Sequence, residues 1–300
     1  MKKRTVIIMT SFLLFGCGPK VSNETPTTES LMIGGPSGNE LAQEQVFRKN
    51  NGSDPGTLDP HRAEGVPASN VLRDLYEGLV SEAANGDYIP GVAESWSISE
   101  DGKTYRFKIR EEAIWSNGDR VVAEDFVFSL RRSVDPKTLS NYSSMLYPIK
   151  NARDVVLGKL PTDMLSVSAE NEKTLVIAPA EPTPYFISLL THSTTYPVPP
   201  PSVKEYGTSF TRPENMISNG AFTLKDWRIQ DYILLERNEK YWDNPSTTLS
   251  QVYYYPLDNP DASLRRYRAN ELDFTDTTPS EQLPWIKKNL KDELKITPYF

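Results

Sequence analysis

Few residues in this chain of 300 amino acids have the types and the spacing that catalysis requires. A hydrolytic triad places a base beside its nucleophile, but the chain has only two histidines, His61 and His192, and no serine lies in a G-x-S-x-G elbow. The two histidines do not form a metal-binding pattern either. We therefore expect no enzyme, no metal and no cofactor, and a structural role for both histidines.

The single cysteine, Cys17, is the residue whose position says most about chemistry. It follows an apolar run at residues 6–15, which itself follows three cations at residues 2–4. Ten helical residues are too short to cross a hydrocarbon layer about 30 Å thick, so the run is typical of an export signal. We predict a signal peptide at residues 1–17 and an extracytoplasmic protein, periplasmic or at the cell surface.

The residues around Cys17 also predict a lipid anchor. Leu14-Phe15-Gly16-Cys17 resembles a bacterial lipobox, in which the thiol receives a diacylglycerol and becomes the new N-terminus after cleavage. Phe15 departs from the small or aliphatic residue that is usual there. Because no other thiol occurs in the chain, we expect Cys17 to be lipidated. The alternative is an ordinary signal peptide with an incidental cysteine.

Composition and charge limit the class of protein and the partners that it can bind. The hydrophobic and charged fractions, 38% and 24%, are ordinary for a soluble globular protein, and the net charge is -7. Without the leader, 30 basic residues face 40 acidic ones, which argues against nucleic acid or anionic lipid as the main partner. No later segment has 18 consecutive apolar residues, and one cysteine cannot form an internal disulfide. The polar stretch at 18–44 predicts a flexible tether.

The remaining sequence predicts mixed α and β structure. Alternating apolar residues at 94–98 and 104–110 flank an Asp-Gly turn, which predicts a hairpin. Two further hairpins are expected at 165–177 and at 222–237. Helical spacing is found near residues 71–79, 123–134 and 263–272, where Asn270 is a candidate left-handed terminus. Short strands are expected at 46–48 and 273–275.

Five segments in a fixed order resemble the extracytoplasmic solute-binding proteins of ABC peptide importers, family 5, and most of all the oligopeptide-binding branch. The segments are TLDPHRAEGVPASNVLRDLYEGL (57–79), PGVAESW (90–96), WSNGDRVVAEDFVFSLRRSVDP (115–136), EPTPYFISLL (181–190) and SNGAFTLKDW (218–227). One departure is Val122, where the family commonly has Thr or Ser as a helix N-cap. Losing that cap should cost about 1 kcal/mol.

The resemblance implies an α/β fold of the periplasmic binding protein type, type II, with mixed sheets and two lobes around a cleft. Lobe I would comprise residues 45–76 and 200–300 and be incomplete, and the smaller lobe II would comprise 77–199. The family normally exceeds five hundred residues, so the chain would stop before the second large lobe. We therefore expect weak or no peptide binding by these 300 residues alone.

The resemblance also implies a function and a site. Extended oligopeptides would be held through their main chains and delivered to the permease subunits of an ABC importer. By position, Glu64, Val66 and Tyr142 would contact the ligand, with Arg73 as an acid-pairing candidate. Alternatives are another solute (a dipeptide, haem, nickel or a sugar) or a surface adaptor in which the proline cluster at 196–201 is a docking motif instead of a crossing between lobes.

Overall fold

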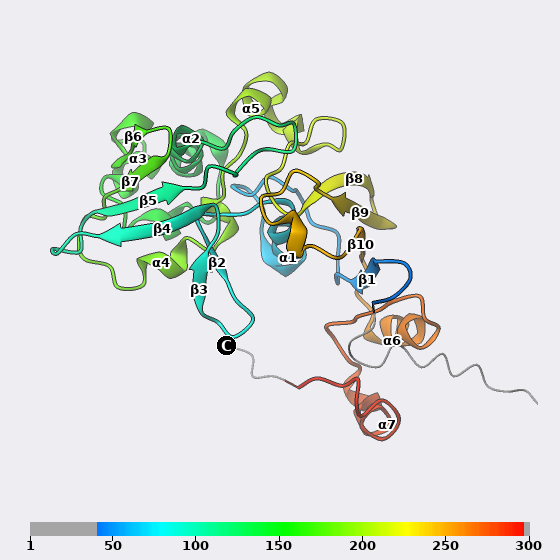
Figure 1. The fold of residues 1–300 in the computed structure, drawn as a ribbon. Coiled ribbons are helices and arrows are strands. Elements are labelled where there is room, and N and C mark those ends of the chain that lie inside the picture. The colour runs from blue at the N-terminus through cyan, green and yellow to red at the C-terminus, as the bar shows by residue number, and fades with distance from the viewer. Residues whose placement is uncertain (1–40, 297–300) are drawn as a thin grey trace, which may run out of the picture. The chain divides into compact units, whose positions relative to one another are not determined.

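The computed structural model describes residues 41–296. The predicted signal peptide, Cys17 and nearly all of the predicted tether lie outside the described residues. Within the described residues, the chain from Gln43 to residue 296 forms one compact unit. Figure 1 shows its elements, which form three separate sheets with helices packed against them.

The first sheet joins strands that are far apart in the sequence. Its order is β1 (Val46–Asn50), β10 (Gln251–Tyr255), β9 (Tyr232–Arg237) and β8 (Phe222–Arg228). β1 runs parallel to β10, whereas the other pairs are antiparallel. The helix α1 (Gly65–Leu75) packs on this sheet, where the Tyr254 hydroxyl donates to Asp74 at 2.6 Å.

The second four-stranded sheet is built from the two predicted hairpins of the middle sequence. Its order is β4 (Ala93–Ile98), β5 (Tyr105–Ile109), β7 (Thr174–Ile177) and β6 (Val167–Asn171), and every pair is antiparallel. In β5 the predicted alternation is confirmed, because Tyr105, Phe107 and Ile109 are buried while the residues between them are exposed.

The helix α2 (Ala123–Val134) packs against β6 and β7. Its predicted apolar stripe is buried, which confirms this helix. Val122 is the N-cap and offers no side-chain acceptor, while the side chain of Asp125 accepts a hydrogen bond from the Val122 amide at 3.1 Å. Half of a capping box is therefore present without its Ser or Thr.

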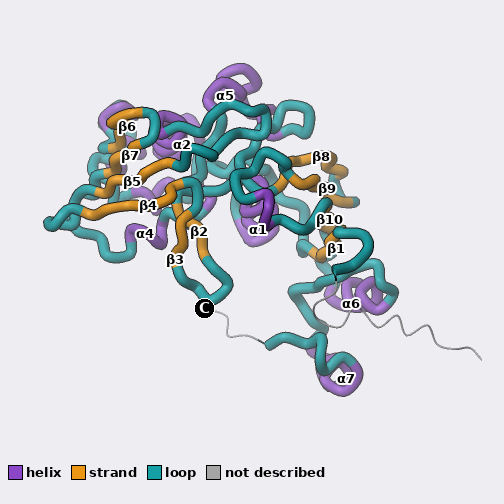
Figure 2. The backbone as a smooth tube through the Cα atoms, in the orientation of Figure 1, coloured by secondary structure: helices purple, strands orange, loops and turns teal. Residues whose placement is uncertain are grey.

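Shorter helices and strands lie between long loops, as Figure 2 shows, together with several short 3₁₀ helices. Besides the 3₁₀ helices, these elements are the hairpin of β2 (Val80–Glu82) and β3 (Tyr88–Pro90) and the helices α3 (Ala152–Val156), α4 (Phe186–Leu189), α5 (Pro200–Tyr206), α6 (Pro260–Arg268) and α7 (Leu283–Asn289).

Two predicted helix boundaries and one predicted strand are wrong. Helix α1 ends at Leu75 because Tyr76 is extended, so Leu79 is buried but lies beyond the helix. Helix α6 covers Pro260–Arg268 and not 263–272, since Asn259 caps it by accepting from the Ala262 amide. Residues 273–275 form no strand and contribute one bridge between Phe274 and Lys49. Asn270 does adopt the expected positive φ, 59°.

The strands of the first sheet come from the stretches assigned to lobe I, and those of the other two sheets from the stretch assigned to lobe II. The mixed α/β class with several sheets is confirmed. The lobe boundaries stay a prediction, because a hydrophobic core that includes Leu72, Phe107 and Phe126 continues across both stretches.

Candidate ligand-binding site

The loop that ends at Glu64 is fixed by a buried polar cluster, whereas Val66, which was expected in the same loop, lies in the first turn of α1. Asp59 accepts from both terminal nitrogens of Arg132, at 2.8 and 2.6 Å. Arg132 also lies 2.7 Å from Nδ1 of His61, whose Nε2 is 2.9 Å from the Tyr196 carbonyl oxygen. Because arginine only donates and a carbonyl only accepts, His61 must be the neutral tautomer that carries its proton on Nε2.

The electrostatics of this cluster agree with its hydrogen bonds. Burial, followed by the positive charge of Arg132, lowers the pKa of His61 to about 4. Burial alone would raise the pKa of Asp59, but the Arg132 hydrogen bonds hold it below its ordinary value. The cluster therefore contains one ion pair and one neutral imidazole, and the histidine is structural, as expected.

A small hollow of about 220 Å³ lies beside this loop. It is lined by Ala63, Gly65, Val66, Ser69, Tyr142, His192 and Ser193. Val66 is 55% exposed, so its side chain is free to contact a ligand. The Tyr142 ring meets the His192 ring edge-on, with centroids 5.0 Å apart. The hollow thus combines an apolar side chain, a phenol, an imidazole and two serines.

Three of the four sequence-predicted site residues gather at this hollow. Val66 and Tyr142 line it, and Glu64 is bonded to Asn141, the residue before Tyr142. Gly65 permits the turn of the backbone between Glu64 and Val66, since its φ of 77° lies in the left-handed region. Arg73, the fourth predicted site residue, does not line this hollow. Sequence analysis missed the contribution of His192 and Ser193, which carry no periodic signal and reach the hollow only through tertiary packing.

Arg73 instead lines a second hollow of about 180 Å³, together with Glu77, Glu82 and Tyr241. It forms an exposed ion pair with Glu82 at 3.8 Å. An exposed pair of this kind contributes little to stability.

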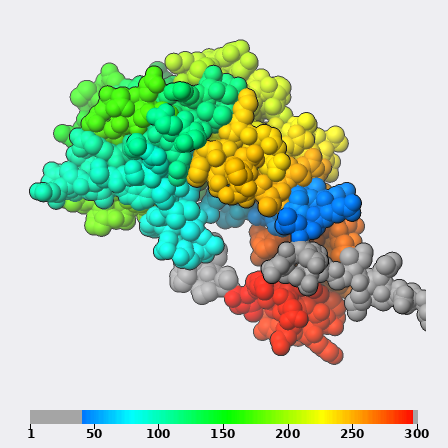
Figure 3. Space-filling view, in the orientation of Figure 1, coloured from blue at the N-terminus to red at the C-terminus, as the bar shows by residue number. Residues whose placement is uncertain are grey.

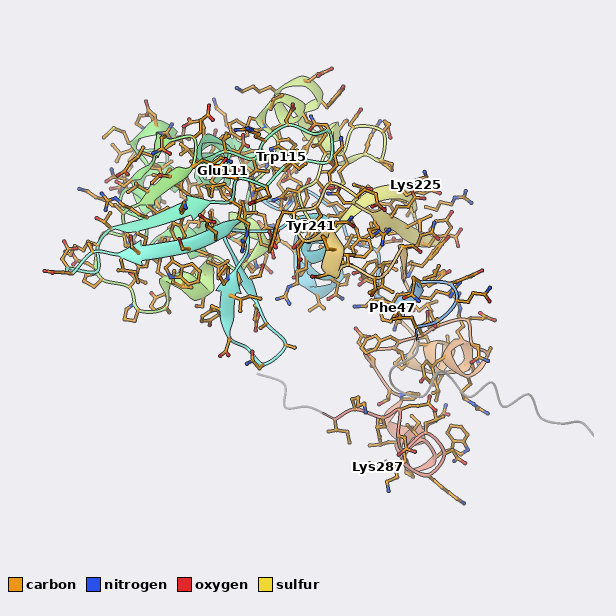
Figure 4. The ribbon with its side chains drawn as sticks, in the orientation of Figure 1. Phe47, Glu111, Trp115, Lys225, Tyr241 and Lys287 are labelled. Carbon is orange, nitrogen blue, oxygen red and sulfur yellow. The ribbon has the colours of Figure 1, made fainter. Side chains whose placement is uncertain are left out.

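Glu77 is the unusual residue of the second hollow. Its two carboxylate oxygens accept from the Tyr241 hydroxyl and the Trp242 indole, each at 2.6 Å (Figure 4, where Tyr241 is labelled). The Arg110 guanidinium stacks 3.8 Å from the Trp242 ring. Burial raises the pKa of Glu77 to about 7 despite these hydrogen bonds.

The backbone of Glu77 is held as well. The side-chain amide of Asn219 accepts from its N–H and donates to its carbonyl, at 3.2 and 2.9 Å. In Figure 3 the gold atoms near residue 240 lie directly against the green-cyan atoms near residue 110, which matches the stacking of Trp242 on Arg110. Asn219 and Glu77 therefore fasten the segment between α1 and β2 to two distant loops.

The proline cluster at 196–201 is packed into the protein. Tyr196 and Val198 are buried, and the Val198 amide donates to Ser129 of α2 at 2.9 Å. Pro200 and Pro201 begin α5. A buried segment is not available to a docking domain. The packing of the proline cluster therefore argues against the alternative in which this cluster is the docking motif of a surface adaptor.

Among residues 41–296, no group of three or more His, Cys, Asp or Glu side chains is arranged to hold a metal ion. Within the same range, no helix has the length and apolar character needed to span a membrane.

The comparisons with known proteins identify the family. Residues 87–300 match the bacterial extracellular solute-binding proteins, family 5 Middle. The chain is 43% identical over 267 residues to the periplasmic oligopeptide-binding protein OppA of Escherichia coli, and equally identical over 265 residues to its "Probable deoxycholate-binding periplasmic protein YgiS"; each match covers 88% of this chain and 49% of the relative. The crystal structure of Haemophilus influenzae OppA in complex with RPPGFSPFR is similar with a TM-score of 0.82 and 41% identity, covering 84% of this chain and 50% of that one.

The chain therefore belongs to the family 5 bacterial extracellular solute-binding proteins, as the sequence resemblance implied. It spans about half the length of the curated relatives it matches. Since the family is one of binding proteins, the expectation that the chain is not an enzyme is confirmed.

Proposed function

We propose that this chain is the ligand-binding component of an ABC importer and takes extended oligopeptides. The observation that carries the proposal is the meeting of Glu64, Val66 and Tyr142 around one hollow. Solved relatives that share its fold are described as bound to peptide, among them OppA proteins of Haemophilus influenzae and Listeria monocytogenes. Hydrogen bonds to a peptide main chain do not depend on its side chains, which suits a binder of varied sequences.

In this proposal the hollow contacts one stretch of the peptide. The exposed Val66 packs against a ligand side chain, and the Tyr142 phenol supplies a hydrogen-bond donor at the end of a rigid ring. Glu64 orients Asn141 and thereby the loop that carries Tyr142. Arg73 acts from the second hollow, where it would pair with an acidic group.

A hollow of about 220 Å³ is smaller than a usual site for a drug-sized ligand. A peptide covered on one side only keeps its other side hydrated, so we propose that these 300 residues alone bind peptides weakly or not at all. Isothermal titration calorimetry with tri- to pentapeptides tests this. Micromolar affinity would contradict it.

The site itself is tested by nuclear magnetic resonance, which detects millimolar binding. Titration with trialanine should shift backbone amides at 63–69, 141–144 and 192–193. The variant Tyr142→Ala should abolish these shifts, whereas Tyr147→Ala, a control tyrosine that does not line the hollow, should leave them intact. Shifts confined to other residues would contradict the assignment.

A second candidate solute is a bile-acid-like amphipathic carboxylate. The observation that favours it is the identity to YgiS, which equals the identity to OppA at 43%. Deoxycholate, titrated below its micelle concentration in the same experiment, should leave the amides of the hollow unchanged if the chain prefers peptides. Stronger shifts with deoxycholate than with trialanine would reverse the assignment.

We further propose that the protein is exported and anchored through a lipid on Cys17, beside the permease subunits that receive the solute. The apolar run and the lipobox-like segment before Cys17 support this. Cells that express the chain should incorporate labelled palmitate into it. The variant Cys17→Ser should lose the label, and retention of the label would contradict the anchor.

A further inference from the structure

A third hollow, of about 490 Å³, is lined by residues of α2, of α5 and of the segments that follow these helices. The two helices pack against each other. The hollow shares no lining residue with either hollow described above. Its volume falls within the range that small-molecule sites occupy. Nothing in the proposed peptide-binding function uses it.

Positive charge is concentrated in this hollow. Arg62, Arg131, Arg132 and Lys137 line it, although the whole chain carries a net charge of -7. Of these four, Arg132 is bound to Asp59 in the cluster already described. The other three form no ion pair with any residue in the range 41–296 that the structure describes.

Two carboxylates also line the hollow, and neither neutralises those cations by contact. Asp135 uses one oxygen to accept from the Lys137 backbone amide at 2.9 Å, which caps the short 3₁₀ helix at Pro136–Thr138. Glu124 is exposed in the first turn of α2, where it suits the helix dipole. The cations thus outnumber the acidic groups even when Asp59 is included.

Arg131 supplies a buried donor without an acceptor. One terminal nitrogen donates to the Asp163 carbonyl at 3.3 Å, which holds the side chain in place. Its Nε is buried and has no partner among the described residues. A buried donor without an acceptor is unfavourable, and an oxyanion bound by the Arg131 guanidinium would supply one.

The hollow also has apolar lining residues, Phe128 of α2 and Val203 of α5. Lys204 adds a cation 5.7 Å from the centre of the Phe128 ring. The planar fork of arginine matches phosphate oxygens better than other side chains do. We propose that this hollow binds a phosphate ester, with its oxygens at Arg131 and Arg62 and its organic part against Phe128 and Val203.

Phenyl phosphate is the probe that combines both features, and calorimetry and amide shifts of the full chain measure its binding. We expect millimolar or tighter affinity, with shifts at residues 128–138 and 203–208. Phenol, which lacks the charge, and inorganic phosphate, which lacks the ring, should each bind at least tenfold more weakly. Binding should weaken as salt is raised, because the cations are partly exposed.

Arg131→Gln should reduce phenyl phosphate affinity at least tenfold, and Arg131→Lys should restore only part of it because the Nε donor is lost. Arg153→Gln is the matched control, since Arg153 lies outside the hollow and also forms no ion pair with the described residues. Circular dichroism and thermal unfolding establish that each variant folds. Absence of binding to the wild-type chain, or equal binding by phenol, would overturn the proposal, as would unchanged affinity in Arg131→Gln.

The source of the phosphate is distinguished by sedimentation with phosphatidylglycerol vesicles. Sedimentation that Arg131→Gln abolishes assigns the ester to a lipid headgroup. If phenyl phosphate binds and the vesicles do not, the ester is a soluble molecule. Vesicle binding that survives Arg131→Gln, without phenyl phosphate binding, would contradict the site.

Discussion

Arg132 holds Asp59 through both terminal nitrogens, with Nη1 2.8 Å from Oδ1 and Nη2 2.6 Å from Oδ2. Their side chains are only 14% and 4% exposed, so this is the buried ion pair of the protein's described part. The pair connects the loop that carries Glu64 to helix α2. The pair thereby holds in place the loop that ends at Glu64, next to the candidate site.

Asp59→Asn should lower the free energy of unfolding by about 3–5 kcal/mol, because Arg132 is left buried without its counter-charge. Urea unfolding measures this. Glu82→Gln is the matched control, since it breaks the exposed pair with Arg73 and should cost less than about 1 kcal/mol. Equal losses of unfolding free energy in the two variants would mean that burial does not determine how much an ion pair contributes to stability.

His61 should make the protein less stable in acid. The unfolded chain binds a proton with a pKa near 6.5, whereas the folded imidazole binds it only near pH 4. Stability from this group is therefore complete above pH 6.5 and is lost as the pH falls to 4, by about 3 kcal/mol. Measured by urea unfolding, the stability difference between wild type and His61→Gln should shrink over this window. A constant difference would show that His61 is not buried as a neutral base.

Glu77 should have the opposite effect on the pH dependence of stability, so that the protein gains stability from this group as the pH falls. Its pKa is about 7 in the folded protein and about 4.5 in the unfolded chain, so the folded state holds the proton between these values. Relative to Glu77→Gln, the wild-type protein should gain about 3 kcal/mol as the pH falls from 8 to 4.5. Carboxyl carbon resonances should report the titration directly, and a Glu77 midpoint below pH 5 would refute the shift.

Gly220 should not tolerate a side chain. A Cβ there would lie 2.6 Å from the Asp74 carbonyl oxygen and 2.8 Å from the Tyr76 amide nitrogen, which are backbone atoms. Gly220→Ala should therefore cost about 1–3 kcal/mol by forcing the backbone apart. At Gly56 a Cβ meets nothing within 4 Å, so Gly56→Ala should change stability by less than about 0.5 kcal/mol. Thermal and urea unfolding compare the two, and a tolerated Gly220→Ala would disprove the close packing.

Val122→Thr should stabilise α2 by up to about 1 kcal/mol, because a hydroxyl would complete the capping box that Asp125 already half forms. Val122→Ala controls for the lost methyl groups, since it removes them without adding an acceptor. Urea unfolding should rank threonine above valine and valine at or above alanine. Threonine at or below alanine would contradict the capping argument.

Local patterns predicted the elements whose partners are close in the sequence. The hairpins of β4 with β5, β6 with β7 and β8 with β9 follow from alternating apolar residues around a short turn. The strand β10 was missed, because Tyr253 and Tyr255 stack on the face opposite to the buried Val252 and Tyr254 and hide the alternation. Its parallel pairing with β1 joins residues about two hundred positions apart, and no local pattern encodes such a pairing.

The candidate site also contains residues that the sequence predicted and residues that only the structure revealed. Order and spacing of the family segments led to Glu64, Val66 and Tyr142, and the structure brings these residues to one hollow. Arg73 was selected from the same segments, yet α1 directs it to a different hollow. His192 was assigned a structural role only, because whether an isolated histidine is buried or lines a hollow depends on distant residues.

The amino-acid order by itself determined the family, the class of fold and the hairpins, since hydrophobic periodicity and turn residues act between neighbours. Only the tertiary structure decided which side chains meet. It brings Arg132 to Asp59 and His61, and Glu77 to Tyr241 and Trp242. It also places three other cations around the hollow that Arg131 lines. The reason is physical. A pKa shift or a binding hollow arises from burial and from charges a few ångströms away, and those neighbours lie tens to hundreds of residues apart along the chain.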